Sequence, residues 1–166
     1  MPFYTLALII ALFTVSHAVQ AAEVCASRVI AAPIDEVWLR IRDFGSHADW
    51  IKGSPKVWLE GGAGTTVGVK SYTQFSDGDV YVETLTALDD KAHTLKYDVI
   101  GELPLPIYNA SGAFRLYPVT KDNSTLIERC LYYDTSLPKE KQAAFAKGRT
   151  QVLASSLDLL SDLLAK

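Results

Sequence analysis

The chain has 166 residues, of which 49% are hydrophobic and 21% are charged. These proportions are typical of a single globular domain with a sizeable core, and they exclude a disordered or low-complexity chain. The formal net charge is -3, and the 16 lysines and arginines are scattered along the sequence instead of forming a basic stripe with aromatic residues. We therefore expect no nucleic-acid partner.

An uncharged leader opens the chain. Residues 1–21 hold no Lys, Arg, Asp or Glu, and the apolar run Leu6–Val15 is followed by small and polar residues that end at Ala21. This pattern predicts a signal peptide with cleavage near Ala21, although the basic residues that usually precede the apolar run are missing. A membrane anchor is the weaker alternative, because the run is short for a span. We expect residues 22–166 to form a secreted or periplasmic domain with no stable membrane insertion after cleavage.

Strand signals dominate the middle of the chain. A β-rich run, Val24–Ala31, precedes Pro33, which opens a short helix, and Ser46–Trp50 predicts one further helical turn. Six strand-like runs then alternate with turns rich in Gly, Pro, Asp and Asn. These runs are Val57–Glu60, Val67–Phe75, Val80–Leu88, Thr94–Ile100, Tyr108–Tyr117 and Thr125–Tyr133.

The last stretch, Leu137–Lys166, predicts one long amphipathic helix with Pro138 in its first turn and Ser136 or Leu137 as the cap. At ~1.5 Å per residue it would reach roughly 40 Å, the width of a small domain. Its apolar side needs a partner surface, and the strands are the available one. The sequence thus predicts an α+β fold in which a curved antiparallel sheet wraps around a C-terminal helix. The apolar side consists of Phe145, Val152, Leu153, Ser156, Leu157, Leu160 and Leu164.

Two cysteines in an exported protein can form a disulfide. If the first strand, from Val24, pairs antiparallel with a last strand that runs to about Thr135, Cys25 faces a residue near Asp134 and not Cys130. A bridge requires Cα atoms within ~7 Å. This register favours two buried thiols, with the disulfide as the alternative.

No set of residues has the spacing of a metal site. After residue 21 the sequence contains two histidines, His47 and His93, and the two cysteines lack ligand spacing. A capping or cavity-mouth role is the better prediction for His47. We expect neither a metal nor a cofactor.

The alternation of side chains along the strands predicts which residues face inward. Thr84 and Thr86 suit solvent, so Tyr81 and Glu83 turn toward the interior. The same argument places Tyr97 inside, and Tyr108 and Phe114 on the inner side of the following strand. A buried, unpaired carboxylate is costly, so Glu83 should be protonated or lie beside a cation.

The order of strand, two short helices, six strands and one long helix resembles the START-like (SRPBCC) superfamily, which includes the birch pollen allergen fold and the polyketide cyclase and dehydrase family. The resemblance covers nearly all of residues 22–166 and implies a helix-grip fold with a hydrophobic cavity. It rests on Ile30-Ala31-Ala32-Pro33, Val37-Trp38, Asp43-Phe44, Trp50, Gly64 to Lys70, Glu83, Asp89 and Leu95 to Tyr97.

Within this superfamily the plant lachrymatory-factor synthases look similar near Lys70, where they carry a cavity arginine, and at Glu83. The resemblance implies a pocket that holds Lys70, Glu83, Tyr97 and Tyr108. Polarity alone would send Lys70 to solvent, but it is the natural partner for an inward Glu83 on the adjacent strand. The alternative is an ordinary cross-strand pair of the two residues on the solvent face. Further expected ligand contacts are Trp50, Tyr72, Tyr81 and Phe114.

These residues suggest three functions. A carboxylate with a raised pKa can move protons, and Lys70 and the tyrosines can stabilise an oxyanion, so Glu83 and Lys70 are the candidate catalytic pair of a cofactor-independent cyclase, dehydratase or isomerase. A carrier for a small hydrophobic molecule needs only the cavity and one polar anchor. An accessory protein of an extracytoplasmic oxidoreductase, acting through protein contacts, is the remaining alternative.

Overall fold

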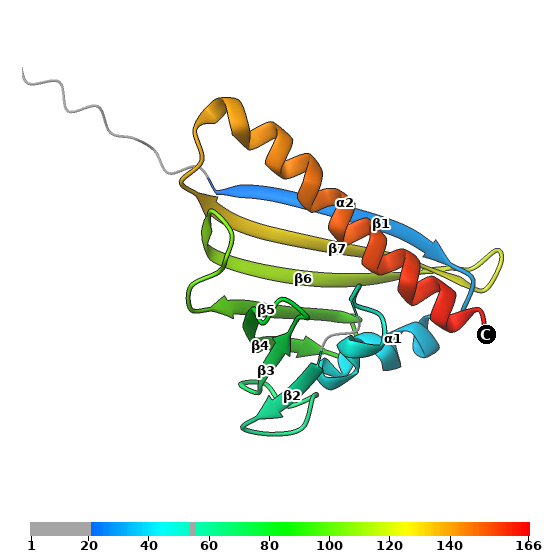
Figure 1. The fold of residues 1–166 in the computed structure, drawn as a ribbon. Coiled ribbons are helices and arrows are strands. Elements are labelled where there is room, and N and C mark those ends of the chain that lie inside the picture. Colours follow the sequence, from blue (N-terminus) through cyan, green and yellow to red (C-terminus); the bar gives the residue numbers. More distant parts are fainter. Residues whose placement is uncertain (1–20, 54–55) are drawn as a thin grey trace, which may run out of the picture.

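In the computed structural model, which describes residues 21–53 and 56–166, seven antiparallel strands form one sheet in the order β1-β7-β6-β5-β4-β3-β2 (Figure 1). Two short helices follow the first strand and a long helix ends the chain, so the predicted α+β helix-grip architecture is confirmed. The elements are β1 (Ala22–Ile30), α1 (Ile34–Arg42), the 3-10 helix η1 (Phe44–Asp49), β2 (Lys56–Glu60), β3 (Lys70–Gln74), β4 (Val80–Asp89), β5 (Thr94–Ile100), β6 (Ile107–Val119), β7 (Ser124–Thr135) and α2 (Lys139–Leu164).

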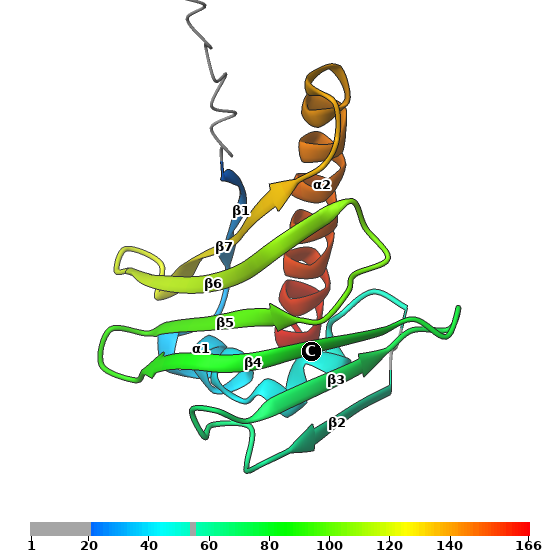
Figure 2. The same cartoon turned by 90° about the vertical axis from the view of Figure 1, so that its left-hand side faces the viewer.

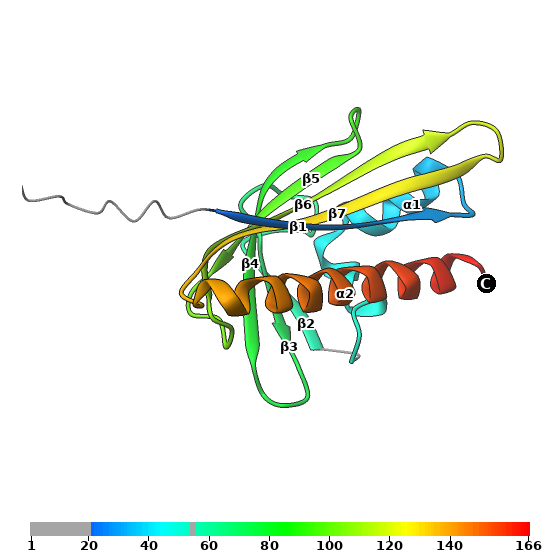
Figure 3. The same ribbon diagram turned by 90° about the horizontal axis from the view of Figure 1, so that it is seen from above.

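Helix α2 runs beside β1 and β7 along their length, while the sheet twists away toward β2 (Figures 2 and 3). Its buried side consists of Leu153, Ser156, Leu157 and Leu160, which belong to the predicted apolar side. Pro138 is the N-cap and has an extended backbone, so the helix begins two residues later than predicted. The Arg28 guanidinium of β1 donates to Asp158 of α2 at 2.6 Å, which ties the two elements together at the surface.

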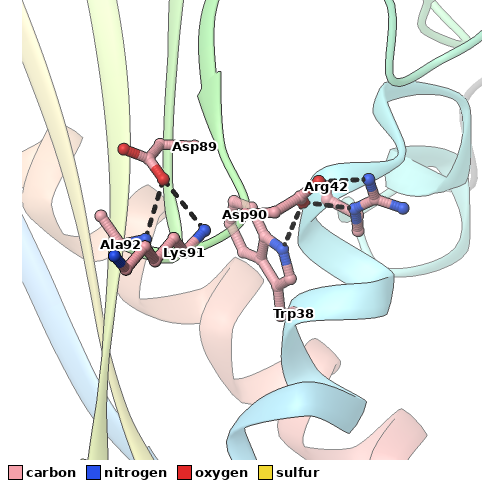
Figure 4. A network of polar contacts seen from close by, with 6 residues as sticks. All are labelled: Trp38, Arg42, Asp89, Asp90, Lys91 and Ala92. Atoms are coloured by element: carbon pink, nitrogen blue, oxygen red, sulfur yellow. Dashed lines mark hydrogen bonds and ion pairs between the residues drawn. The ribbon is translucent and has the colours of Figure 1, made fainter.

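Helix α1 is held by the turn between β4 and β5 (Figure 4). The Asp90 carboxylate accepts hydrogen bonds from Arg42 Nε and Nη2 and from Trp38 Nε1, each at 2.8 Å. Asp89 shapes the same turn by accepting from the backbone N–H groups of Lys91 and Ala92. The charged hydrogen bonds from Arg42, and then the one from Trp38, hold the pKa of Asp90 below its usual value. The α1–η1 segment is thereby fixed against the end of the sheet.

The two cysteines form a disulfide, so the prediction of separate thiols is wrong. The β1–β7 ladder pairs Cys25 with Cys130, because Val24 opposes Leu131 and not Thr135. The end of β7 extends beyond the edge strand and pairs with β6 instead, where Ile107 opposes Thr135. Strand β1 also begins at Ala22, two residues earlier than predicted. The overhang and the earlier start together account for the misplaced register.

The described helices include none that is long and apolar enough to cross a membrane. The predicted signal peptide lies, except for Ala21, outside the described residues.

Candidate functional site

A pocket of about 320 Å³ lies between α2 and the sheet. Its wall is largely apolar, and its exposed members, such as Lys52 and Asp77, mark the side that opens to solvent. The volume and the mixture of an apolar wall with a few polar groups are typical of small-molecule sites. The lining residues are Ile51, Lys52, Thr73, Phe75, Asp77, Tyr81, Glu83, Tyr97, Val99, Leu103, Leu105, Ile107, Arg129, Leu131, Arg149, Val152, Leu153 and Ser156.

Glu83 is in the wall of this pocket, as the alternation along its strand predicts. It lies in β4, directly across from Ser71 of β3 and Val99 of β5. Burial raises the pKa of the Glu83 carboxyl above its usual 4.5, and the positive charge of Arg129 opposes that rise. A carboxyl group in this setting binds and releases its proton closer to neutral pH than an exposed one does.

Arg129 is the cation that accompanies Glu83. It projects from β7 with its guanidinium over the rings of Trp50 and Phe114, at 5.8 and 5.1 Å from their centroids. Its Nη1 donates to the Ser156 hydroxyl of α2 at 2.7 Å. Its Nε is buried and has no hydrogen-bond partner within the described part of the chain. These contacts hold the guanidinium in place in the pocket wall.

Glu83 and Arg129 do not form an ion pair: among the described residues, no Glu83 oxygen lies within 4.0 Å of an Arg129 nitrogen. Both nevertheless line the same pocket. The positive charge of Arg129 also acts on the Glu83 carboxyl, since it opposes the rise in its pKa.

Tyr97 is a further polar side chain of the pocket, beside Glu83 and Arg129. Only 3% of its surface is exposed, and burial raises the pKa of its hydroxyl above the usual 10.0, with Arg129 opposing the rise. The phenol therefore stays protonated at neutral pH and can donate a hydrogen bond. Its ring lies over Gly112, its partner across the β5–β6 ladder.

The predicted pairing of Lys70 with Glu83 is wrong. Lys70 opposes Thr84 across the β3–β4 ladder and is exposed on the outer face, while Ser71 is the residue opposite Glu83. Successive side chains of a strand point to opposite faces of the sheet, so Lys70 and Glu83 lie on opposite faces. Lys70 faces solvent, as the polarity of its side chain alone predicts.

Tyr72 and Tyr108, two of the predicted ligand contacts, also lie away from the pocket. Tyr72 is on the outer face, where its ring stacks on Trp58 and its hydroxyl donates to Glu60 at 2.6 Å. Tyr108 is 46% exposed, because an irregularity in the β6–β7 ladder at Asn109, whose φ is 49°, reverses the side-chain phase of β6. Ile107 takes the inward position instead.

The remaining predicted contacts fall into two groups. Tyr81 lines the pocket, whereas Trp50 and Phe114 are 1% and 0% exposed and lie behind the wall, against Arg129. The structure thus brings Tyr81, Glu83 and Tyr97 together in the lining, with Trp50 and Phe114 as their support.

His47 is part of the packed interior and not of the pocket lining. Its ring packs among Phe44, Trp50 and Phe114, and its Nε2 lies 3.2 Å from the Ile41 carbonyl oxygen. Burial, opposed by the hydrogen bond to Ile41 and helped by the charge of Arg129, lowers its pKa to about 3, so the imidazole is neutral above that pH. A cavity-mouth position is excluded.

In residues 21–53 and 56–166, one group of three potential metal ligands comes together: Glu23, Cys25 and Cys130. Because both of its sulfurs are in the disulfide, this group does not fit a metal ion.

Arg129 is the site residue that the sequence analysis missed. A signal for it exists, because alternation along β7 puts Arg129 on the same face as Ile127, Leu131 and Tyr133, all apolar or aromatic. A lone cation in an otherwise apolar inward set indicates a site. Lys70 was predicted instead because it lies on the strand adjacent to Glu83 and because related proteins carry a cavity arginine at its position.

Residues 21–165 match a family model described as "Polyketide cyclase / dehydrase and lipid transport". No curated protein matches the chain. Among solved structures, a Nitrosospira multiformis protein is 27% identical, with a TM-score of 0.70 over 85% of this chain and 94% of that one. A Thermobifida fusca protein is 25% identical, with a TM-score of 0.68 over 84% and 90% of the two chains.

A plant enzyme shares the fold. Norcoclaurine synthase from Thalictrum flavum, solved in complex with dopamine and hydroxybenzaldehyde, is 20% identical with a TM-score of 0.71, and the match covers 97% of each chain.

Proposed function

The chain belongs to the polyketide cyclase and dehydrase family, and from this we propose that it binds a small lipophilic carbonyl compound in the α2–sheet pocket and catalyses proton transfer on it. The observation that carries the proposal is the placement of Glu83, which has a raised pKa, in the same pocket wall as Arg129, which has no carboxylate partner in the described part of the chain. The apolar lining supports a lipophilic ligand, because burial of apolar surface drives its entry.

The polar groups suggest a division of roles. A ligand carbonyl oxygen in the pocket would accept hydrogen bonds from the Tyr97 hydroxyl and from the Arg129 guanidinium. Both donors stabilise negative charge on that oxygen, and the low dielectric of the pocket strengthens their effect. The fixed guanidinium, held by Ser156, Trp50 and Phe114, needs little rearrangement to do so.

Glu83 would serve as the base and then as the acid. Its carboxylate takes a proton from the carbon next to the carbonyl, which yields an enolate whose oxygen is held by Tyr97 and Arg129. The enolate carbon attacks a second carbonyl of the same molecule, and the new alkoxide takes the proton back from Glu83. A second proton abstraction and loss of hydroxide, which leaves as water with the Glu83 proton, completes a dehydration. The steps move protons and electron pairs within the ligand and Glu83.

This chemistry can be tested before the natural ligand is known. The protein in D₂O is incubated with a lipophilic ketone such as 2-decanone, and mass spectrometry follows deuterium entry next to the carbonyl. We expect exchange above the buffer rate with the wild type, and none above it with Glu83→Gln. Fluorescence of an added hydrophobic dye reports pocket occupancy in both proteins.

The dye experiment separates the enzyme from a carrier. Dye binding without deuterium exchange in the wild type would indicate a lipid carrier and not an enzyme. The family description also includes lipid transport. Absence of both from a folded sample would contradict any small-molecule function for the pocket.

We also propose that the protein is exported after removal of residues 1–21. The Cys25–Cys130 disulfide supports this, because such bonds persist in oxidising compartments. The intact mass of the protein recovered outside the cytosol is the test. We expect a chain that starts near Ala22 and carries no free thiol, whereas a full-length cytosolic chain with two thiols would contradict export.

A further inference from the structure

The pocket has a second cation, Arg149, that the proton-transfer chemistry does not use. Arg149 projects from α2, is half-buried, and lines the pocket. Its guanidinium lies over the ring of Phe145, 5.6 Å from the centroid. Within the described ranges it has no carboxylate oxygen within 4.0 Å. The guanidinium fork is therefore held at the pocket wall with its charge uncompensated.

Lys52 is an exposed member of the same pocket lining. Its neighbour Gly53 is close to Phe75, since a β-carbon on the glycine would be 3.9 Å from that ring. Phe75 packs edge-on against Tyr81 at 5.3 Å between centroids. Arg149 in turn is near Tyr81: burial, and then Asp79, raise the pKa of that tyrosine, while Arg149 lowers it.

The charge of the pocket wall is positive although the chain is net negative. Lys52, Arg129 and Arg149 are its cations, and Asp77 and Glu83 are its acids. Asp77 accepts a hydrogen bond from the Asp79 N–H within its own turn, and Glu83 holds its proton more tightly than an exposed glutamate does. An excess of cations in an apolar recess favours a bound anion, because desolvated charge is costly without a partner.

Helix α2 sets the spacing between Arg149 and Ser156, the hydrogen-bond partner of Arg129. The two residues are seven positions apart, so their backbones are separated by roughly 10 Å along the helix axis at 1.5 Å per residue. Both residues line the pocket. Val152 and Leu153 line the wall between these points. An extended chain covers about 3.3–3.6 Å per three bonds, so roughly eight or nine bonds match the backbone spacing from Arg149 to Ser156.

We propose that the ligand is an apolar chain with a carboxylate at one end, held by Arg149 at the opening, and with its carbonyl eight or nine bonds away beside Arg129 and Glu83. A carboxylate matches the planar fork of a guanidinium and can accept two hydrogen bonds from it. Lys52 adds positive charge at the opening without such a fork. This inference rests on the proposed function, and it adds the chemical class and length of the ligand.

The test compares decanoate with decanol, which have the same chain length, by isothermal titration calorimetry. We expect the wild type to bind decanoate at least about tenfold more tightly, the size of a charged hydrogen bond. Arg149→Met should remove this preference by lowering the affinity for decanoate to that for decanol. Lys147→Met is the matched control, because it removes the same charge from an exposed position on the same helix, and it should keep the preference.

A second measurement tests the length and does not depend on a variant. Two oxodecanoates, with the ketone at the ninth or at the fifth carbon, are incubated with the wild type in D₂O. We expect deuterium exchange at least about tenfold faster in the first compound, whose ketone reaches Glu83.

The outcomes distinguish the two proposals. Three outcomes would overturn the carboxylate site: equal affinity of the wild type for decanoate and decanol, an equal loss of the preference in the Arg149 and Lys147 variants, or equal exchange in the two keto acids. In each case, decanol binding and exchange in 2-decanone would still uphold the proposed function. If neither decanoate nor decanol binds, the carboxylate site and the proposed function are both overturned. If Arg149→Met does not fold, the decanoate preference of the wild type should still fall as salt is raised, and an unchanged preference would count against the inference.

Discussion

The ring of Tyr97 fills the space in which a β-carbon on Gly112 would lie. The two residues are partners across the β5–β6 ladder, so the absence of a side chain on one strand lets the phenol of the other lie flat against the sheet. This arrangement leaves the hydroxyl in the pocket wall near Glu83 and Arg129. Gly112 is therefore required for the position of a proposed site residue that lies fifteen residues away in sequence.

Gly112→Ala should displace Tyr97 and destabilise the protein by about 1–3 kcal/mol, the usual cost of overpacking. Exchange in 2-decanone should fall as well, since one hydrogen-bond donor to the carbonyl is moved. Gly148→Ala is the matched control, because its β-carbon would meet no atom within 4 Å and helix propensity favours alanine by up to about 1 kcal/mol. Urea denaturation measures the stability of both variants. Equal stability of the two variants would contradict the proposed packing.

Glu83→Gln should change how stability depends on pH. The pKa of Glu83 is raised on folding, so between its usual 4.5 and the higher native value the folded state binds more protons than the unfolded state does. Its contribution is complete below pH 4.5 and is lost as pH rises through the native pKa.

The free energy of unfolding, measured from pH 4 to pH 8, should therefore fall with rising pH in the wild type relative to Glu83→Gln. Glu102→Gln, at an exposed position in the β5–β6 loop, should keep the wild-type slope. Parallel curves for the wild type and Glu83→Gln would show that the carboxyl is not desolvated.

His47 should make the protein sensitive to acid. Its pKa falls from 6.5 to about 3 on folding, so the unfolded state binds the extra proton in that window and stability is lost as pH falls through it. A shift of this size corresponds to about 5 kcal/mol at most. His47→Gln should lose less stability than the wild type between pH 6.5 and pH 3. His93→Gln retains His47 and should show the wild-type loss. Thermal unfolding across this range is the measurement, and an identical loss in all three proteins would contradict the buried neutral imidazole.

The two candidate cations can be compared directly. Arg129→Met should lower the exchange rate about 10²–10³-fold, as removal of one donor to a developing oxyanion does in other enzymes. Lys70→Met removes a positive charge from the outer face and should leave the rate within about twofold. Deuterium exchange in 2-decanone, with circular dichroism to confirm folding, gives both values. A larger effect from Lys70 would mean that the pocket is not where exchange takes place.

Removal of the disulfide should cost about 2–5 kcal/mol of stability, because the bond closes a long loop in the unfolded chain, with a sequence separation of 105. The Cys25→Ala, Cys130→Ala double variant should unfold at lower urea than the oxidised wild type. Addition of dithiothreitol should bring the wild type close to the variant and leave the variant unchanged. No response of the wild type to the reductant would show that the bond is absent in solution.

Local patterns in the sequence were enough to predict the elements. Periods of two and of three to four residues identified the strands and the long helix, and Pro33 and Pro138 marked the starts of α1 and α2 to within a turn. The inward position of Glu83 also followed from alternation, since Thr84 on the opposite side suits solvent. These features depend on neighbours along the chain, which the sequence shows directly.

Relations between strands were decided by the tertiary structure. Cys25 meets Cys130 because β7 extends beyond β1, and Tyr108 turns outward because of the ladder irregularity at Asn109. Arg129, and not Lys70, shares the pocket with Glu83, although Lys70 is much closer to it in sequence. The sequence by itself determined the fold class and the inward-facing acid, because side-chain period and polarity are local. Register, bulges and the partner of that acid depend on how distant strands align, and a shift of one residue in a strand moves every side chain to the opposite face.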